Sequence, residues 1–262
     1  MTEGWRWSRI ALGLLFTLAG PVHAGEIPAT EKRSGLDFVS PETRNLQADD
    51  MSNPGMLWVI EGERLWREPA ETSHASCEGC HGDAAKSMRG VAARYPVFDE
   101  ETKSPVDLQG RINSCRRERQ KEPAFALESE ELLALTAYVA HQSRGMPIAP
   151  AQDDRLKPFV ENGHSLFQQR AGQLDLSCAS CHDENWGKRL GSSPIPQAHP
   201  TAYPLYRLEW QTLGSLQRRL RNCMIGMRAE PFPYGSAELV ELELYLMFRA
   251  AGLPLETPGV RP

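Results

Sequence analysis

The segment Cys77-Glu78-Gly79-Cys80-His81 returns 101 positions later as Cys178-Ala179-Ser180-Cys181-His182. In each copy, two cysteines are separated by two residues and followed at once by a histidine. Two thiols at this spacing can add to the two vinyl groups of one haem, and the histidine then reaches the iron as an axial ligand. A structural zinc site would need four ligands in one place, whereas these motifs lie far apart in the sequence. The pair therefore predicts two covalently bound c-type haems, attached through Cys77, Cys80, Cys178 and Cys181 and ligated by His81 and His182.

The N-terminus has the three-part pattern of a secretory signal peptide. Arg6 and Arg9 precede an apolar run over residues 10–18, and Val22-His23-Ala24 forms a small-residue cleavage site. We assign residues 1–24 to the signal peptide and expect a periplasmic protein with no membrane span after cleavage. Loss of Arg6, Arg9 and Glu3 changes the formal net charge from -5 to -6. This acidic balance argues against a nucleic-acid partner and is compatible with docking to a basic redox protein.

The two motifs belong to an internal duplication of the chain. The first part of the repeat matches at a shift of 101 positions, the middle at 108 after seven extra residues, and the end at 107. The matching pairs are Gly62 with Gly163, Trp66 with Phe167, Ser76-Cys77 with Ser177-Cys178, Tyr95-Pro96 with Tyr203-Pro204, Cys115 with Cys223, Tyr138 with Tyr245, Gly145 with Gly252, and Pro147 with Pro254. The sequence therefore predicts a tandem repeat of one haem-binding unit.

Each unit has the pattern of a mainly helical domain. An opening helix begins at Ser52-Asn53-Pro54, and apolar stripes predict closing helices over 130–144 and from Ser236 to Gly252. We predict two tandem class I cytochrome c-like domains, residues 52–150 and 151–262, joined by a stiff Pro147–Pro150 connection. Residues 25–51 are expected to form an extended segment over the first domain. Neither unit is large enough to bury a sizeable core alone, so haem should supply much of the interior.

Cys115 and Cys223 occupy the same place in the two units, and three interpretations compete. They could form a disulfide, they could be buried and inert, or each could be the sixth ligand of the haem in its own unit. We favour the third, because neither methionine nor histidine, the other plausible ligands, recurs in register between the units. A thiolate ligand pushes electron density onto the iron and should lower its reduction potential relative to methionine.

The surroundings of the two cysteines differ. Cys115 is followed by the charged run Arg116–Lys121, whereas Cys223 lies between Arg218-Arg219-Leu220-Arg221 and an apolar segment that continues to Pro233. Arginine beside a thiol favours the thiolate. The second site therefore has the character of a pocket for a small anion. We predict that Arg219, one helical turn before Cys223, contacts the anion and that Arg221 lies behind it.

Several longer strings, together with both haem motifs, carry a family resemblance. They are Ser40-Pro41-Glu42-Thr43, Asp49-Asp50, Asn53-Pro54-Gly55-Met56, Arg219 to Cys223, and the tail Glu256-Thr257-Pro258-Gly259-Val260-Arg261-Pro262. Over essentially the whole mature chain the sequence resembles the SoxA family, the dihaem subunits of the SoxAX cytochromes of bacterial sulfur oxidation. Some members lack the first haem motif, and this chain retains it.

The resemblance implies an L-cysteine S-thiosulfotransferase activity. Thiosulfate would be joined oxidatively to a cysteine of the SoxYZ carrier, and two electrons would pass through the monohaem partner SoxX to a soluble cytochrome c. It also implies that Cys223 is a haem ligand carrying a persulfide, that Arg219 belongs to the active site and that Cys115 ligates the first haem. A passive dihaem electron carrier remains the alternative. A dihaem peroxidase would need an open sixth position, against which the paired cysteine ligands argue.

Overall fold

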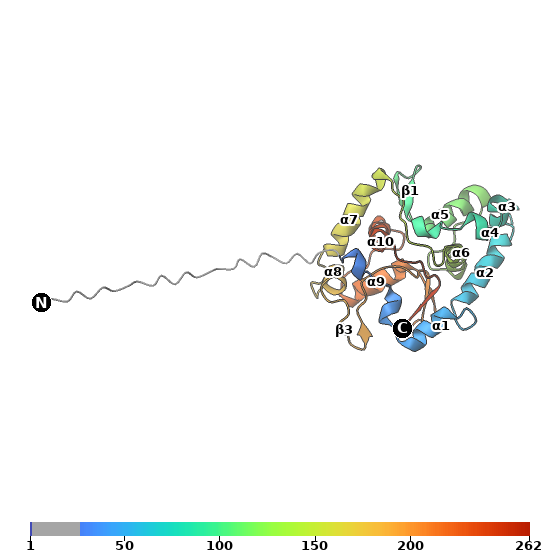
Figure 1. The fold of residues 1–262 in the computed structure, drawn as a ribbon. Helices are drawn as coiled ribbons and strands as arrows, with labels where there is room; N and C mark the ends of the chain where they lie inside the picture. Colours follow the sequence, from blue (N-terminus) through green and yellow to red (C-terminus); the bar gives the residue numbers. More distant parts are fainter. Residues whose placement is uncertain (2–26) are drawn as a thin grey trace.

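Two pairs of crossed helices form the frame of the molecule (Figure 1). In the first half α2 (Met56–Arg67) packs across α6 (Glu130–His141), and in the second half α7 (Lys157–Gln168) packs across α10 (Ala237–Arg249). The computed structural model describes Met1 and residues 27–262. Apart from Met1, the predicted signal peptide lies outside the described residues.

A glycine allows each pair of helices to approach closely. A Cβ atom on Gly62 would lie 2.1 Å from the carbonyl oxygen of Ala134, and one on Gly163 would lie 2.1 Å from that of Glu241. Both distances are far below van der Waals contact, so only glycine fits at these crossings. The recurrence of glycine at this place in both repeats thus has a packing reason.

Aromatic rings one turn further along repeat this contact in both halves. The ring centroids of Trp66 and Tyr138 are 5.9 Å apart, and those of Phe167 and Tyr245 are 5.4 Å apart. Trp66 and Phe167 are almost fully buried. Each half thus has its own apolar centre where its opening and closing helices cross.

Between these helices, each half carries a haem-motif helix, an antiparallel pair of strands and a cysteine-bearing helix. The first half contains α3 (Cys77–His81), α4 (Ala84–Ser87), η3 (Ala92–Arg94), β1 (Val97–Asp99), β2 (Ser104–Val106), α5 (Leu108–Cys115) and the π-helical η4 (Arg116–Gln120). The second contains η5 (Asp154–Leu156), α8 (Cys178–His182), β3 (Arg189–Leu190), β4 (Ser193–Pro194), β5 (Leu205–Arg207), β6 (Thr212–Gly214) and α9 (Leu216–Gly226). Val97 pairs with Val106 and, 108 positions later, Leu205 pairs with Gly214, so the duplication extends to strand register.

The two halves meet through equivalent segments. Residues 145–148 run antiparallel to residues 252–255, with Pro147 opposite Pro254. Four backbone N–H to carbonyl bonds join them: Gly145 to Leu255 (2.8 Å), Gly252 to Ile148 (2.9 Å), Ile148 to Leu253 (2.8 Å) and Leu255 to Met146 (2.8 Å). The first two bonds are counterparts of each other in the duplication, as are the last two. The halves are therefore related locally like the subunits of a two-fold dimer.

The N-terminal extension contacts both halves, since Leu46 packs against the apolar cluster around Trp66 and the segment around Arg33 lies against the second half. The backbone N–H of Arg33 donates to Oε1 of Gln197 at 2.7 Å, and Nδ1 of His199 donates to the carbonyl of Arg33 at 2.7 Å. The segment also contains η1 (Ala29–Glu31), η2 (Gly35–Phe38) and α1 (Pro41–Ala48). Ser40 caps α1 and Pro41 begins it. This is a helix-start signal that the polar composition of the segment obscured.

The C-terminal tail joins the extension to both halves. Its strand β7 (Gly259–Arg261) pairs in parallel with β5 of the second half. The backbone N–H of Val260 donates to Oε1 of Gln47 in α1 at 2.9 Å, and Nδ2 of Asn53 donates to the carbonyl of Pro258 at 2.9 Å. Val260 is fully buried in an apolar cluster to which both halves contribute, among others through Trp66 and Leu213. Figure 1 shows the C-terminus beside α1.

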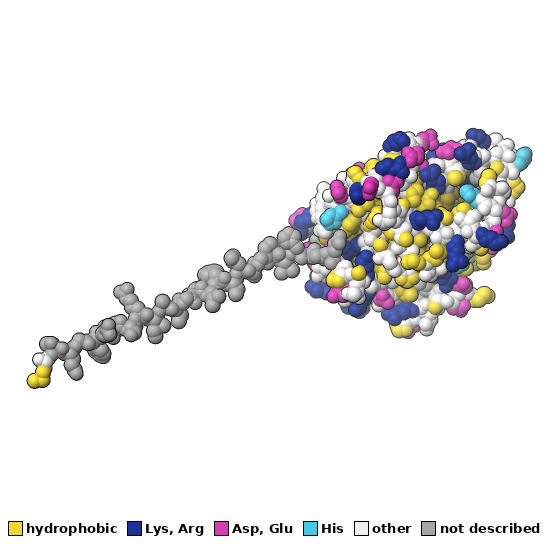
Figure 2. Space-filling model, turned by 45° about the horizontal axis from the view of Figure 1, so that its top comes forward, with side chains coloured by type: hydrophobic (Ala, Val, Ile, Leu, Met, Phe, Trp, Pro, Cys, Tyr) yellow, Lys and Arg dark blue, Asp and Glu magenta, His cyan; other side chains and the backbone are white. Residues whose placement is uncertain are grey.

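The described helices are all too short or too polar to serve as bilayer-spanning segments. On the face drawn in Figure 2, basic and acidic side chains are interspersed around an area where hydrophobic side chains gather.

Replacing Gly163 with alanine should lower the free energy of unfolding by about 3 kcal/mol, because the added methyl group forces α7 away from α10. Denaturant unfolding followed by circular dichroism would measure this. Gly226→Ala is the matched control, since a Cβ atom there meets nothing within 4 Å, and its effect should stay within about 1 kcal/mol. Equal stability of the two variants would contradict this account of the helix crossing.

Candidate functional site

The histidine of the second haem motif and the second lone cysteine share one cavity of about 200 Å³. His182 from α8 and Cys223 from α9 both line it. Its apolar walls include Leu205, Leu216, Leu220 and Leu246. All six cysteines carry free thiols, so Cys115 and Cys223 are not joined by a disulfide. A cavity of this kind, with an imidazole and a thiol inside apolar walls, has the ligands and the low polarity that a haem site requires.

A backbone carbonyl fixes the orientation of the His182 ring. Its Nδ1 donates to the backbone carbonyl of Pro196 at 2.6 Å, which leaves Nε2 as the nitrogen available to a metal. Helix α8 itself begins with a reciprocal capping box between Ser177 and Ser180. His182 also hydrogen-bonds with the thiol of Cys223. The two predicted axial ligands of the second site are therefore brought together.

A buried ion pair holds the end of this motif helix against the closing helix. Arg249 of α10 pairs with Asp183, the residue after His182, and their side chains are only 5% and 4% exposed. Arg249 also donates to the carbonyl of Gln197 at 3.1 Å, next to the carbonyl that orients His182. Its guanidinium lies 5.0 Å from the ring centre of Phe167. Sequence reasoning missed this pair, because its members lie 66 residues apart.

The first motif helix is held by a different and weaker device. Nε1 of Trp66 donates to the carbonyl of Gly82 at 3.2 Å, whereas the equivalent Phe167 has no N–H to donate. Gly82 and Gln142 occupy the places of Asp183 and Arg249 in the first repeat. His81 is exposed, while His182 is half-buried. The second site is thus the more enclosed and the more firmly held.

The thiol of Cys223 is prepared for ionisation. Burial alone would raise its pKa, but the hydrogen bond with His182 and the charge of Arg219 outweigh burial and lower the pKa of Cys223 to about 7. In return, the Cys223 charge raises the pKa of Arg219. By contrast, burial raises the pKa of Cys115 above its usual range, although Arg111 opposes the effect. Of the two equivalent cysteines, only Cys223 lies in surroundings that favour the thiolate.

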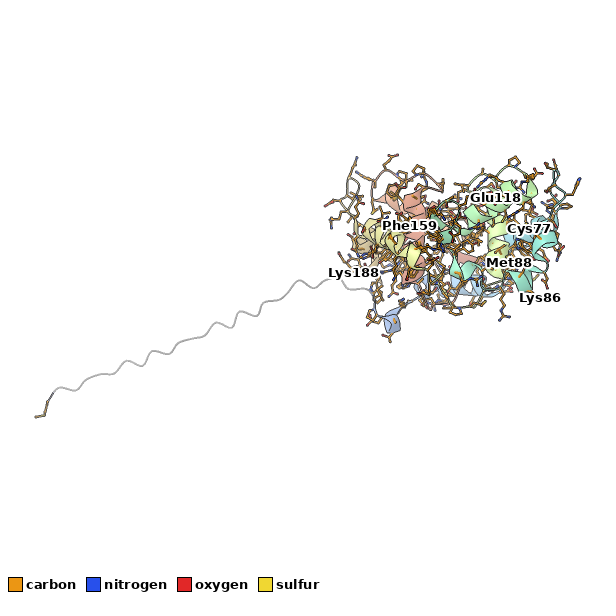
Figure 3. All side chains as sticks on the ribbon, turned by 90° about the horizontal axis from the view of Figure 1, so that it is seen from above. Cys77, Lys86, Met88, Glu118, Phe159 and Lys188 are labelled. Carbon is orange, nitrogen blue, oxygen red and sulfur yellow. The ribbon has the colours of Figure 1, made fainter. Side chains whose placement is uncertain are left out.

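The attachment cysteines lie beside the lone cysteine in each half. Burial raises the pKa of Cys77 to about 11 and that of Cys178 to about 12, and the neighbouring Cys115 and Cys223 respectively add to these shifts. Cys80 is exposed and Cys181 is half-buried. In Figure 3, Cys77 and Met88 lie in one half of the molecule and Phe159 and Lys188 in the other. Each half therefore gathers a complete donor set of two attachment thiols, an imidazole and a further thiol.

Arg219 and Arg221 have different surroundings. Arg219 lines the cavity with Cys223, whereas Arg221 does not. The guanidinium of Arg221 donates to the carbonyl of Phe232 and stacks 4.4 Å from the ring centre of Tyr234. In the first half the equivalent Asn113 makes the same kind of link, with its Nδ2 donating to the carbonyl of Phe125 at 3.0 Å. Arg221 thus fastens the segment after α9, and this role is common to both repeats.

The fold and these donor sets define a c-type cytochrome built from tandem domains. The family model of the SoxA/TsdA cytochrome c domain matches residues 61–148 and 162–255. The L-cysteine S-thiosulfotransferase subunit SoxA of Pseudaminobacter salicylatoxidans is 38% identical, with 89% of this chain and 82% of that protein covered. The same subunit of Rhodovulum sulfidophilum is 36% identical, with 88% and 80% covered.

A solved structure confirms the predicted fold class. The crystal structure of SoxXA from P. pantotrophus superposes with a TM-score of 0.85 at 32% identity, and the match covers 88% of this chain and 87% of that one. The chain therefore belongs to the SoxA family of c-type haem enzymes, the L-cysteine S-thiosulfotransferase subunits.

Arg249→Gln should lower the free energy of unfolding by about 3–5 kcal/mol, because it leaves Asp183 charged, buried and unpaired. The double variant Asp183→Asn with Arg249→Gln should recover most of this loss, since no buried charge then remains. Chemical denaturation of the four proteins of this double-mutant cycle gives the coupling energy. Additive effects of the two substitutions would show that the ion pair does not act as a unit.

Proposed function

We propose that this chain is the dihaem subunit of a periplasmic SoxAX complex that joins thiosulfate oxidatively to a cysteine of the SoxYZ carrier. The observation that carries the proposal is the position of Cys223, with its lowered pKa, in one cavity with His182 and Arg219. The names of the relatives support the same reaction. The overall change is R–SH + S₂O₃²⁻ → R–S–S–SO₃⁻ + H⁺ + 2e⁻. One sulfur–sulfur bond forms, and two electrons must leave the site.

Two covalently bound c-type haems would serve the two motifs. Cys77 and Cys80 would attach the first haem, and His81 and Cys115 would hold its iron. Cys178 and Cys181 would attach the second, with His182 and Cys223 as ligands. When bound, a haem supplies a one-electron acceptor beside the reacting sulfur. The two donor sets support this assignment, because each half collects the same four side chains.

In the proposed site, the protein's own residues manage charge and position. Cys223 holds the reacting sulfur as a thiolate or persulfide. Arg219 offsets the repulsion between this anion and the incoming thiosulfate dianion. Arg221, which the sequence placed behind Arg219, holds the segment at Pro231 and Phe232 that follows α9. The first haem, whose motif helix is more exposed, would be structural or vestigial.

The proposed partners follow from this chemistry and from the family. SoxX, a monohaem cytochrome c, would form a heterodimer with this chain and receive the electrons. It would pass them to a soluble cytochrome c acceptor. A match to a SoxXA structure supports this pairing. Thiosulfate is the small-molecule substrate, and the cysteine arm of SoxYZ is the macromolecular one. Export to the periplasm rests on the predicted signal peptide.

A passive dihaem electron carrier is the competing function. The pKa of Cys223 favours the transferase, because a carrier needs no polarised sulfur and the equivalent Cys115 has none. Mass spectrometry of the intact chain discriminates between the two functions. One additional labile sulfur atom on Cys223 is expected for the transferase, and its absence from freshly purified protein would favour the carrier.

Cys223→Ala should abolish thiosulfate-dependent reduction of the acceptor cytochrome, measured in the complex with SoxYZ present. Arg219→Gln should lower kcat/KM on the order of a hundredfold, because a charge-assisted contact to the anion is lost. Arg221→Gln is the matched control, since it removes a neighbouring arginine that does not line the cavity, and its loss should be under about tenfold. Full activity of the Cys223 variant would refute the proposal.

A further inference from the structure

The two repeats differ in charge at the end of one strand. Asp99 is the last residue of β1, and Arg207 is the last residue of the equivalent β5. Both strands pair in the same register with their partners, so the two side chains start from matching places. The facing helices also match, since Arg111 in α5 and Arg219 in α9 each precede a lone cysteine by four residues. Between the repeats, therefore, the strand residue changes sign and the helix residue does not.

In the first half this position neutralises the helix arginine. Nη2 of Arg111 donates to Oδ2 of Asp99 at 2.7 Å, and the Asp99 side chain is 11% exposed. The other carboxylate oxygen accepts backbone N–H bonds from Glu101 at 2.8 Å and Thr102 at 3.0 Å. Both carboxylate oxygens of Asp99 therefore have partners. The positive charge of Arg111 is neutralised by Asp99 and would attract an incoming anion only weakly.

In the second half, two guanidinium groups replace this ion pair. Arg207 and Arg219 line the cavity that contains Cys223, and Arg219 forms no salt bridge within residues 27–262. Arg207 has an exposed partner in Glu209 at 3.1 Å, but its own side chain is only 15% exposed. Its Nε is buried and makes no hydrogen bond to any residue that the structure describes. Burial and the charge of Arg219 both lower the pKa of Arg207.

We propose that Arg207 and Arg219 together form an anion site beside Cys223 that has no counterpart in the first half. Two half-buried guanidinium groups of like charge, one of them with a buried N–H donor that has no partner in the described part of the chain, are unfavourable unless an anion lies between or against them. Guanidinium groups bind oxyanions through charge-assisted hydrogen bonds. The chemical class of ligand is thus an oxyanion group: the sulfonate end of thiosulfate, or a propionate of the second haem. Binding of the thiosulfate sulfonate rests on the proposed function, whereas binding of a haem propionate requires only that the second haem is present.

A graded series at Arg207 tests this site in the mature chain within its complex. Arg207→Lys keeps the charge, Arg207→Gln removes it, and Arg207→Asp installs the first-repeat residue opposite Arg219. Lys157→Gln is the control, because it removes an exposed positive charge from the same half. For each protein, KM for thiosulfate and the reduction potential of the second haem are measured, the latter by spectroelectrochemical titration with the first haem as internal reference.

A substrate site predicts that KM rises about tenfold in Arg207→Gln and further in Arg207→Asp, with the potential unchanged. A propionate site predicts that the potential of the second haem falls in the same order, with KM unchanged. Either pattern supports an anion site, and Arg207→Lys should lie close to the parent protein in both. If Arg207→Gln and Arg207→Asp match Lys157→Gln in both measurements, the proposal is overturned. A parent complex without thiosulfate activity would refute the proposed function alone, because the potentials still test the anion site.

Discussion

The close approach of the opening and closing helices is the constraint on which each half depends. With glycine at the crossing, the backbone of α7 lies against that of α10, and any side chain at Gly163 would separate them. That distance positions Arg249 on α10 over Phe167 of α7 and brings it to Asp183 at the end of the haem-motif helix. Arg249 also bonds the carbonyl of Gln197, next to the Pro196 carbonyl that orients His182. A packing contact that does not line the cavity thereby helps to position a predicted iron ligand.

The duplication gives the molecule an internal comparison that is independent of other proteins. Both halves keep the helix crossing, the strand register and the link from the cysteine helix to the following segment. They differ in the contact that holds the haem-motif helix in place. In the first half an indole N–H holds the motif helix, and in the second a buried ion pair holds it. Because a buried pair loses much more when one partner is removed than a neutral hydrogen bond does, the second arrangement tolerates less change.

Local patterns in the sequence were sufficient to predict the two haem-motif segments, the closing helices and the equivalence of Cys115 and Cys223 in the duplication. They could not show that the segment around Arg33 contacts the second half, because those contacts join residues more than 160 positions apart. Arg221 was predicted to lie behind Arg219 because it is near Cys223 in sequence. The sequence could not show that its guanidinium donates to the carbonyl of Phe232, as the equivalent Asn113 donates to that of Phe125. Helical periodicity places a side chain on a face, but the partner on that face comes from tertiary structure.

The arginines that lie near Cys223 in the sequence do not by themselves explain why its surroundings differ from those of Cys115. Arg111 stands in the first repeat where Arg219 stands in the second, so an arginine one turn before the cysteine is common to both. The difference lies on the strand opposite, where Asp99 cancels Arg111 and Arg207 reinforces Arg219. Reversing one charge at the end of this strand changes a neutral site into a cationic one. Because a thiolate and a dianion can approach only where positive charge is left unpaired, this strand residue is the physical reason to assign sulfur chemistry to the second half.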